Sequence, residues 1–314
     1  MKIFDTHDGL KIRFDTYKCG TKTCRGLVVL LGGRSEFIEK YRETVDQLLV
    51  RKLDVVTFDW RGQGLSDRLL PNRYKGHVAS YDDYLKDLIG FMDRHVLKKA
   101  DRPVIMLANS MGGHIALRYL HDFPGRVDKA VLTSPLIDIA GPVLLTRAIK
   151  TMVKIAVRIG FEKYYATRAN DFDPSKKVFT GNRLTRDRHR FQKTIQMIVD
   201  NPDVAVGGVT FGWLDATFNS IQHMMVDGYF ESIATPVKMI SAGGDEIVSV
   251  TAHRKVCRKL PNCDLVVIPN ALHELLIEKD TVLEKFWEVF DAFVLGRLQN
   301  RPADTPTKKR ACLS

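Results

Sequence analysis

The sequence predicts an α/β fold, in which a mostly parallel β-sheet is flanked by helices and carries an inserted helical cap. Three observations predict this class. Short apolar runs, typical of strands buried on both faces, alternate with segments of helical periodicity. This alternation stops between residues 137 and 229 and then returns. The 314 residues, 45% of them hydrophobic, are enough for one large domain with an insertion.

The first part of the chain is expected to begin with a hairpin and to continue as strand–helix units. Asp8-Gly9 is a hairpin turn sequence, so the flanking strands 2–6 and 10–17 are expected to be antiparallel. The later strands are expected from apolar runs at 26–31, 53–58, 103–108 and 129–133. Helices are expected where apolar residues recur at three- and four-residue steps, at 36–50, 81–97 and 111–121.

The second part repeats the pattern after the insertion. Strands are expected at 237–240 and 265–268, and helices at 251–260 and 282–298. We therefore divide the chain into a core of residues 1–136 and 230–300, a helical cap of residues 137–229, and a disordered tail of residues 301–314. The cap is expected over the carboxyl ends of the strands, where α/β proteins bind ligands.

The net charge and the motifs of the sequence indicate which kinds of molecule the protein contacts. The net charge of +11 favours anionic surfaces, and no nucleic-acid-binding motif is present in the sequence, so contact with an anionic membrane is favoured over nucleic acid. No apolar run is long enough to cross a bilayer, and the N-terminus lacks the apolar stretch of a signal peptide. We expect a cytoplasmic protein, with peripheral contact at the inner face of the membrane as an option. Reduced thiols are expected, although Cys257 and Cys263 are close enough in sequence to approach each other.

A sharp corner separates the strand 103–108 from the helix that follows, and Ser110 lies at this corner. Ala108 and Gly112 flank the serine at minus two and plus two, and Gly113 follows. The segment resembles the nucleophile elbow G-x-S-x-G of α/β-hydrolases, with Ala in place of the first Gly. The alternative interpretation is a strand–helix turn with an ordinary N-cap serine.

A serine nucleophile needs a base, which is usually a histidine oriented by a carboxylate. Asp245 follows a predicted strand and is the expected acid, with its neighbour Glu246 as the alternative. His273 follows the next strand and is the expected base, because no other of the nine histidines lies at a strand end after the acid. His114 and His253 fall within predicted helices, where packing or solvation is the expected role.

Two N–H donors are needed to stabilise the oxyanion of an acyl-transfer intermediate. Met111, which follows the nucleophile, is expected to supply one, and the loop after the strand 26–31 the other. Within that loop we expect the Arg34 N–H, with Gly33 as the alternative donor. A phosphate-binding role for the Arg34 side chain is a weaker alternative.

Longer segments around these residues resemble α/β-hydrolases of the lysophospholipase and monoacylglycerol lipase group. The segments that carry the resemblance are 33–41, 58–68, 109–113, 244–248 and 273–276. The chain departs from the group where Gly32-Gly33 replaces the common His-Gly, and where Ala108-Asn109 replaces Gly-His before the serine. Neither departure removes a member of the triad, but both leave the ester preference open.

The resemblance implies an acyl-enzyme mechanism. Ser110 attacks an ester carbonyl, His273 removes its proton, Asp245 holds His273, and water then releases the acyl group, without metal or cofactor. The implied substrates are lipid monoesters, lysophospholipids or monoacylglycerols. Two alternatives stay open: an esterase or thioesterase for small soluble substrates, and a non-catalytic membrane-associated binding protein on a hydrolase scaffold. The segment 59–68 is expected to be structural, and the oligomeric state is not predicted.

Two features of the predicted cap bear on the substrate. The segment 144–159 is expected to be a helix with one apolar side and one basic side, formed by Arg147, Lys150, Lys154 and Arg158. A helix packed on the domain with a solvated basic face is favoured over a helix lying on a membrane. Five residues are candidates for an acyl-chain pocket, although residues of these types lie by default in the hydrophobic core. They are Phe211, Trp213, Phe218, Met224 and Met225.

Overall fold

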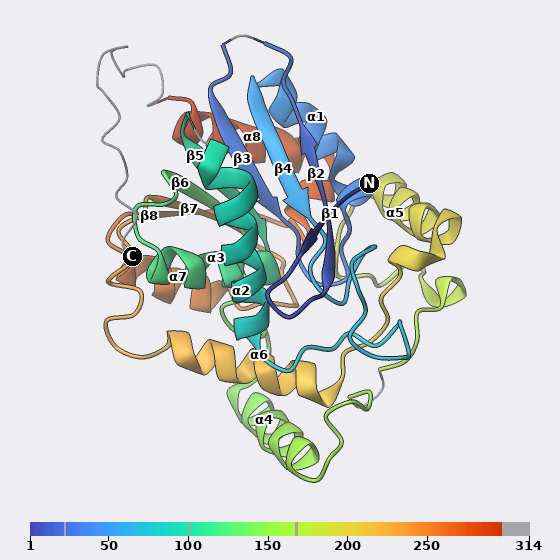
Figure 1. Cartoon of the computed structure of the whole chain (residues 1–314). Coiled ribbons are helices and arrows are strands. Elements are labelled where there is room, and N and C mark those ends of the chain that lie inside the picture. Colours follow the sequence, from blue (N-terminus) through green and yellow to red (C-terminus); the bar gives the residue numbers. More distant parts are fainter. Residues whose placement is uncertain (22, 100, 167–168, 297–314) are drawn as a thin grey trace.

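A single eight-stranded sheet forms the centre of the molecule in the computed structural model, which describes residues 1–21, 23–99, 101–166 and 169–296 (Figure 1). The expected disordered tail lies outside these residues. The strands are β1 (Lys2–Asp5), β2 (Lys11–Tyr17), β3 (Gly26–Leu31), β4 (Leu53–Phe58), β5 (Val104–Asn109), β6 (Lys129–Thr133), β7 (Val237–Ala242) and β8 (Cys263–Ile268). Their order is β1-β2-β4-β3-β5-β6-β7-β8, and β2 is antiparallel to both β1 and β4, whereas the other pairs are parallel. The predicted fold class is therefore confirmed.

Helices cover both faces of this sheet (Figure 1). They are α1 (Arg42–Val50), α2 (Tyr81–Phe91), α3 (Met111–Asp122), α7 (Val250–Lys259) and α8 (Asp280–Val294). In β3, Val28 and Leu30 pack in the cluster formed with α1 and α8, whereas Val29 and Leu31 pack in the cluster formed with α2, α3 and α7. Because successive side chains of a strand point to opposite faces, a strand buried on both faces has to be apolar throughout.

The interval predicted as a cap contains helices between β6 and β7. These helices are α4 (Val143–Arg158), α5 (Arg188–Asp200) and α6 (Phe211–Met224). α4 packs on α6, which in turn contacts α2, and a bridge between Gly76 and Val209 ties the cap to the loop before α2. None of the described helices is long and apolar enough to cross a membrane.

Two predicted helices differ from the observed ones. The helix expected over residues 36–50 begins only at Arg42, after a 3₁₀ turn at Ile38–Tyr41. The Ile38 N–H donates to Asp59 Oδ1 at 2.9 Å, and Glu36 turns its carboxylate back into the preceding loop, so these residues are held outside the helix. The helix expected over residues 81–97 ends its regular α-helical part at Phe91 and continues as a π turn over Met92–Val96.

The expectation of reduced thiols at Cys257 and Cys263 is wrong. The two residues form a disulfide between the last turn of α7 and the first residue of β8. The short connection between α7 and β8 brings their Cα atoms to 5.3 Å, a normal separation for a disulfide. Cys19 and Cys24 are free.

Candidate active site

Ser110 occupies the turn between β5 and α3. Its φ of 49° and ψ of −114° are backbone angles that a residue with a side chain adopts only under strain. The helix starts this close to the strand because two glycines lack side chains. A Cβ on Gly112 would lie 2.5 Å from Gly32 O, and a Cβ on Gly113 would lie 2.8 Å from Pro135 Cβ. The hydroxyl is thereby held at the N-terminus of α3, where backbone N–H groups point outwards.

His273 contacts both Ser110 and Asp245 through its two ring nitrogens. Nε2 lies 2.9 Å from Ser110 Oγ, and Nδ1 lies 2.7 Å from Asp245 Oδ2. Asp245 Oδ1 accepts from the backbone N–H groups of Ile247 and Val248. Burial alone would raise the pKa of the Asp245 carboxyl, but the bonds to His273 and to these N–H groups hold that pKa below its ordinary value. An ionised Asp245 favours the proton on Nδ1, which leaves Nε2 able to accept the Ser110 proton.

The other candidate acid and bases lie in different surroundings. Glu246 is exposed to solvent. His114 is buried, with Nε2 2.7 Å from Ser220 Oγ, and burial lowers its pKa to about 3. His253 is buried, with Nδ1 2.7 Å from Ser241 Oγ, and burial lowers its pKa to about 4. Each of these histidines is a neutral hydrogen-bonding group of the interior near pH 7.

The backbone N–H groups of the oxyanion loop, residues 32–35, differ in their hydrogen bonding. The Gly33 N–H donates to the Glu36 carboxylate, which removes Gly33 as the alternative donor. The Arg34 N–H has no acceptor in the part of the chain that the structure describes. Met111 supplies the first N–H of α3, directly after the serine. The Arg34 and Met111 N–H groups therefore remain the candidate oxyanion donors.

Two side chains that follow β4 hold the oxyanion loop in place. Gln63 Nε2 donates to Gly33 O at 3.1 Å, and Gln63 Oε1 accepts from the Ser35 N–H at 2.7 Å. Trp60 Nε1 donates to Gly32 O at 2.8 Å. The segment 59–68 was expected to be structural, and these hydrogen bonds show that it holds the oxyanion loop.

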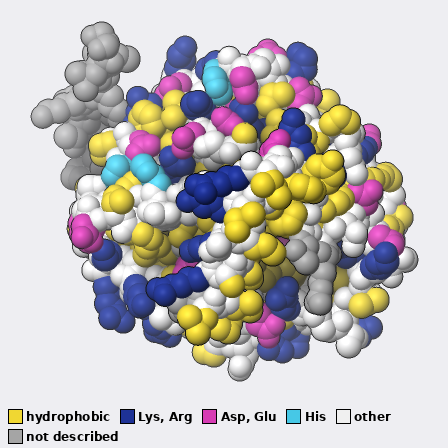
Figure 2. All heavy atoms as spheres, turned by 90° about the horizontal axis from the view of Figure 1, so that it is seen from below, with side chains coloured by type: hydrophobic (Ala, Val, Ile, Leu, Met, Phe, Trp, Pro, Cys, Tyr) yellow, Lys and Arg dark blue, Asp and Glu magenta, His cyan; other side chains and the backbone are white. Residues whose placement is uncertain are grey.

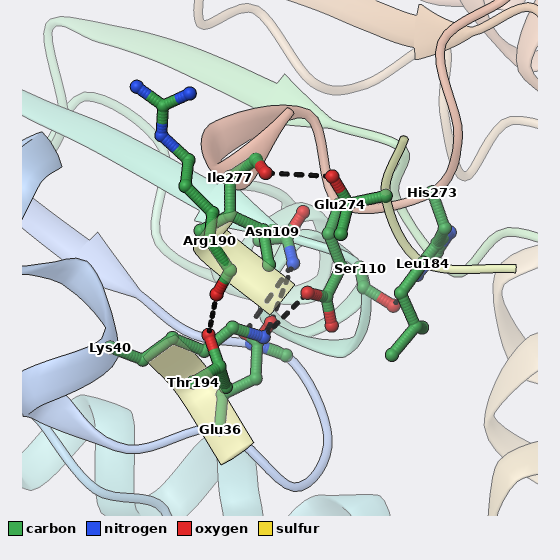
Figure 3. A network of polar contacts seen from close by, with 12 residues as sticks. Glu36, Lys40, Asn109, Ser110, Leu184, Arg190, Thr194, His273, Glu274 and Ile277 are labelled. Atoms are coloured by element: carbon green, nitrogen blue, oxygen red, sulfur yellow. Dashed lines mark hydrogen bonds and ion pairs between the residues drawn. The ribbon is translucent and has the colours of Figure 1, made fainter. Parts of the chain in front are cut away.

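A buried carboxylate, Glu36, links the oxyanion loop to the elbow (Figure 3). It accepts from the Gly33 N–H and the Tyr41 hydroxyl, from Lys40 Nζ at 2.8 Å and from Asn109 Nδ2 at 3.2 Å. Burial alone would raise the pKa of Glu36, but Lys40 and these hydrogen bonds keep it below the ordinary value. The carboxylate is therefore charged and held by donors from three segments.

Lys40 extends this network to the loop that carries His273. Its Nζ lies 2.8 Å from carboxylate oxygens of both Glu36 and Glu274. The Glu274 N–H in turn donates to Leu184 O of the cap at 2.8 Å (Figure 3). Sequence analysis missed the network, although Glu36, Lys40 and Glu274 all lie in segments that carried the resemblance.

An apolar cavity of about 330 Å³ lies between α4, α6 and the segment after β6. Its apolar lining includes Ile139, Leu145, Ile149, Met152, Leu214 and Phe218. Of the five predicted pocket residues, only Phe218 lines this cavity. Trp213 and Met224 belong to the main hydrophobic core, and Phe211 is partly buried at the start of α6. Met225 is 42% exposed and lines a neighbouring, more polar cavity.

Two groups of potential metal ligands occur among the described residues, outside the Ser110–His273–Asp245 unit. They are Cys19, Cys24 and Asp54, and His7, Asp8 and Asp87. Asp54 already pairs with Lys18, and Asp87 with Arg61. These carboxylates are thus neutralised by side chains of the protein itself.

Comparison with known proteins assigns the family. The family model described as serine aminopeptidase S33 matches residues 22–280, which contain Ser110, Asp245 and His273. The chain belongs to this S33 family. Lysophospholipase L2 of Escherichia coli K12 is 31% identical over 265 residues, covering 82% of this chain and 76% of that protein. A monoacylglycerol lipase of Mycolicibacterium smegmatis is 24% identical, covering 88% and 90%. The predicted relationship to lysophospholipases and monoacylglycerol lipases is confirmed.

Solved structures share the fold of this S33 chain. A soluble variant of the monoglyceride lipase of Saccharomyces cerevisiae superposes with a TM-score of 0.76 at 20% identity, covering 93% of this chain and 94% of that one. A carboxyl esterase from Bacillus coagulans superposes with a TM-score of 0.73 at 15% identity, covering 95% and 98%. The S33 chain therefore has the α/β-hydrolase fold, as the sequence predicted, and its family and its curated relatives show that it is a hydrolase.

Proposed function

We propose that the protein cleaves the carboxylic ester of lipid monoesters, lysophospholipids or monoacylglycerols, through an acyl-enzyme intermediate. The observation that carries this proposal is the position of His273, whose ring bridges Ser110 Oγ at 2.9 Å and Asp245 Oδ2 at 2.7 Å. A hydroxyl hydrogen-bonded to an imidazole that is itself held by an ionised carboxylate is the arrangement that activates serine nucleophiles.

The reaction follows from these contacts. His273 Nε2 takes the hydroxyl proton while Ser110 Oγ bonds to the ester carbonyl carbon, and Asp245 stabilises the imidazolium that forms. The imidazolium then gives its proton to the leaving alcohol oxygen as the C–O bond breaks. Water, activated by the same nitrogen, attacks the acyl-enzyme, and the fatty acid leaves as Ser110 regains its proton.

The backbone N–H groups of Met111 and Arg34 are the proposed donors to the oxyanion. Met111 is at the N-terminus of α3, so the helix dipole adds to its attraction for negative charge. Arg34 lies in a loop that Gln63 and Trp60 hold on either side. A donor fixed in this way needs no reorganisation during the reaction and is worth about 3–4 kcal/mol of transition-state stabilisation.

The cap favours an acyl chain over a short soluble acid. The cavity between α4 and α6 is lined mostly by apolar side chains, Phe218 and Met152 among them, and we assign it to the acyl chain. The relatives point in the same direction, since a lysophospholipase L2 and a monoacylglycerol lipase are both named for single-chain lipid esters.

The decisive experiment combines labelling and turnover. A fluorophosphonate probe should label the wild type and leave Ser110→Ala unlabelled, and Ser110→Ala should lose all measurable hydrolysis of lysophospholipids and monoacylglycerols. Ser175→Ala, at an exposed serine of the cap, is the matched control and should keep both properties. A preference for short soluble esters would favour the esterase alternative, and an unlabelled, inactive wild type would favour the non-catalytic one.

We infer further that α4 contacts an anionic membrane surface. Among the side chains of α4 that the structure describes, only that of Val153 is fully buried. Leu144 is 79% exposed, and Ile159, directly after the helix, is 65% exposed. Figure 2 views this side of the molecule and shows hydrophobic side chains beside Lys and Arg. Sequence analysis favoured a packed helix with a solvated basic face, and the exposed apolar residues now favour the membrane interpretation.

Vesicle binding tests this inference. Each basic residue near anionic lipid contributes roughly 1 kcal/mol, so Lys154→Glu/Arg158→Glu should reduce binding to vesicles containing phosphatidylglycerol by about 10-fold or more. Arg42→Glu/Lys285→Glu makes the same charge change on α1 and α8, outside α4, and should reduce binding much less. Equal effects of the two pairs would mean that overall charge, and not α4, directs the protein to the vesicles.

A further inference from the structure

The Arg34 side chain is a partly buried cation that no carboxylate of the described chain neutralises. Its Nη1 donates to the Gly207 carbonyl at 3.1 Å, and its guanidinium lies over the Trp213 ring at 5.8 Å from the centroid. Two more deeply buried arginines have carboxylate partners, Arg13 with Asp59 and Arg61 with Asp87, whereas Arg68, which is partly buried like Arg34, donates to backbone carbonyls. A cation taken out of water without an acidic partner is costly, so binding of an anion at Arg34 would be favourable.

Arg34 also lies beside the reacting groups. It follows Gly33, where a Cβ would be only 3.1 Å from Ser110 Cβ. The backbone N–H of Arg34 is the proposed oxyanion donor, so the side chain of Arg34 begins at the edge of the active site. A substrate whose ester carbonyl is bound by that N–H places its other groups within reach of a long arginine side chain.

The geometry points to Arg34 as the residue that binds the phosphodiester of a lysophospholipid headgroup while Ser110 attacks its acyl ester. In such a lipid only a glycerol unit separates the ester from the phosphate. Guanidinium groups bind phosphate oxygens in a bidentate manner. This inference rests on the proposed function and specifies its substrate: lysophospholipids in preference to neutral monoacylglycerols.

The first experiment measures discrimination. The ratio of kcat/KM for lysophosphatidylglycerol to kcat/KM for the monoacylglycerol with the same acyl chain should fall about 10- to 100-fold in Arg34→Met. Arg34→Lys keeps the charge without the planar fork and should give an intermediate ratio. Any substitution except proline keeps the N–H, and the ratio cancels effects shared by both substrates. An unchanged ratio would overturn the inference and leave Arg34 as a structural tie to Gly207 of the cap.

Ligand protection separates failure of this inference from failure of the proposed function. Glycerophosphoglycerol, which has the headgroup but no ester to cleave, should slow fluorophosphonate labelling of Ser110 in the wild type, with a weaker effect in Arg34→Met. This readout needs no lipid hydrolysis, so it holds even if the wild type proves inactive on lipids. Equal protection of wild type and Arg34→Met would overturn the site. Equal protection of the wild type by inorganic phosphate would overturn its assignment to a lipid headgroup.

Discussion

Glu36 accepts a hydrogen bond from Asn109, with 3.2 Å between Oε1 and Nδ2, and so joins the oxyanion loop to the residue before the nucleophile. The same carboxylate binds Lys40, which also binds Glu274 beside the proposed base. One buried polar network thus reaches the three segments that meet at the reaction centre. Networks of this kind hold reacting groups in place before the substrate binds.

Glu36→Gln tests this positioning role. The substitution keeps the size of the side chain but removes its charge, so Lys40 retains only Glu274 as an acidic partner. We expect kcat to fall by about 10-fold or more, because a displaced oxyanion loop weakens transition-state binding. Breaking the buried pair should lower the free energy of unfolding by about 3 kcal/mol. Steady-state kinetics and urea denaturation measure the two effects, with exposed Glu288→Gln as the control. Wild-type kinetics in Glu36→Gln would show that the network does not position the site.

Asp245→Asn tests the acid of the triad. An amide at this position offers a donor to His273 and favours the wrong tautomer, so kcat should fall by roughly 10⁴-fold while the fold is kept. Glu246→Gln, at the exposed neighbour, should keep kcat within about two-fold. Hydrolysis of a soluble ester gives both values, and similar losses in the two variants would refute the assignment of Asp245.

Two buried histidines predict how stability depends on pH. The native pKa values of His114 and His253 are about 3 and about 4, lowered chiefly by burial from 6.5. Below pH 6.5 the unfolded chain therefore takes up protons that the native protein excludes. Their stabilising contribution is complete above pH 6.5 and is lost as the pH falls towards the native values, by about 1.4 kcal/mol per pH unit for each histidine.

Urea denaturation between pH 7 and pH 5 measures this slope. His114→Gln and His253→Gln should each be less stable at pH 7 than the wild type and should each show a shallower decline. His189→Gln, at an exposed histidine of α5, is the control and should keep the wild-type slope. A wild-type slope in both buried variants would mean that other groups cause the acid sensitivity.

Gly112→Ala tests the close approach at the elbow. The added methyl group would meet two backbone oxygens, Gly32 O at 2.5 Å and Leu31 O at 2.6 Å, which cannot rotate away. We expect the elbow to shift and fluorophosphonate labelling of Ser110 to slow by about 10-fold or more, together with a loss of stability of about 1–3 kcal/mol. Gly90→Ala, in α2, meets nothing within 4 Å and should instead stabilise the protein by about 0.5–1 kcal/mol. Unchanged labelling in Gly112→Ala would show that the turn accommodates a methyl group at this position.

Much of the fold is predictable because hydrophobic periodicity is a local property. The apolar run of β3 predicts a doubly buried strand, and the order of strands and helices predicts a parallel sheet. The start of α1 was not predictable in this way. It depends on Asp59, which is distant in sequence. Asp59 accepts a hydrogen bond from the Ile38 N–H, so α1 begins only after this residue.

Local sequence patterns identify the candidates for the site: Ser110 by its small neighbours, and Asp245 and His273 by their order after successive strands. Contacts between distant segments bear on the close alternatives. The Gly33 N–H is taken by Glu36, and Arg34 lacks an acidic partner in the described chain. The physical reason is that strand and turn preferences depend on residues close in sequence. Whether a buried donor or charge has a partner depends instead on which distant segments the fold brings into contact.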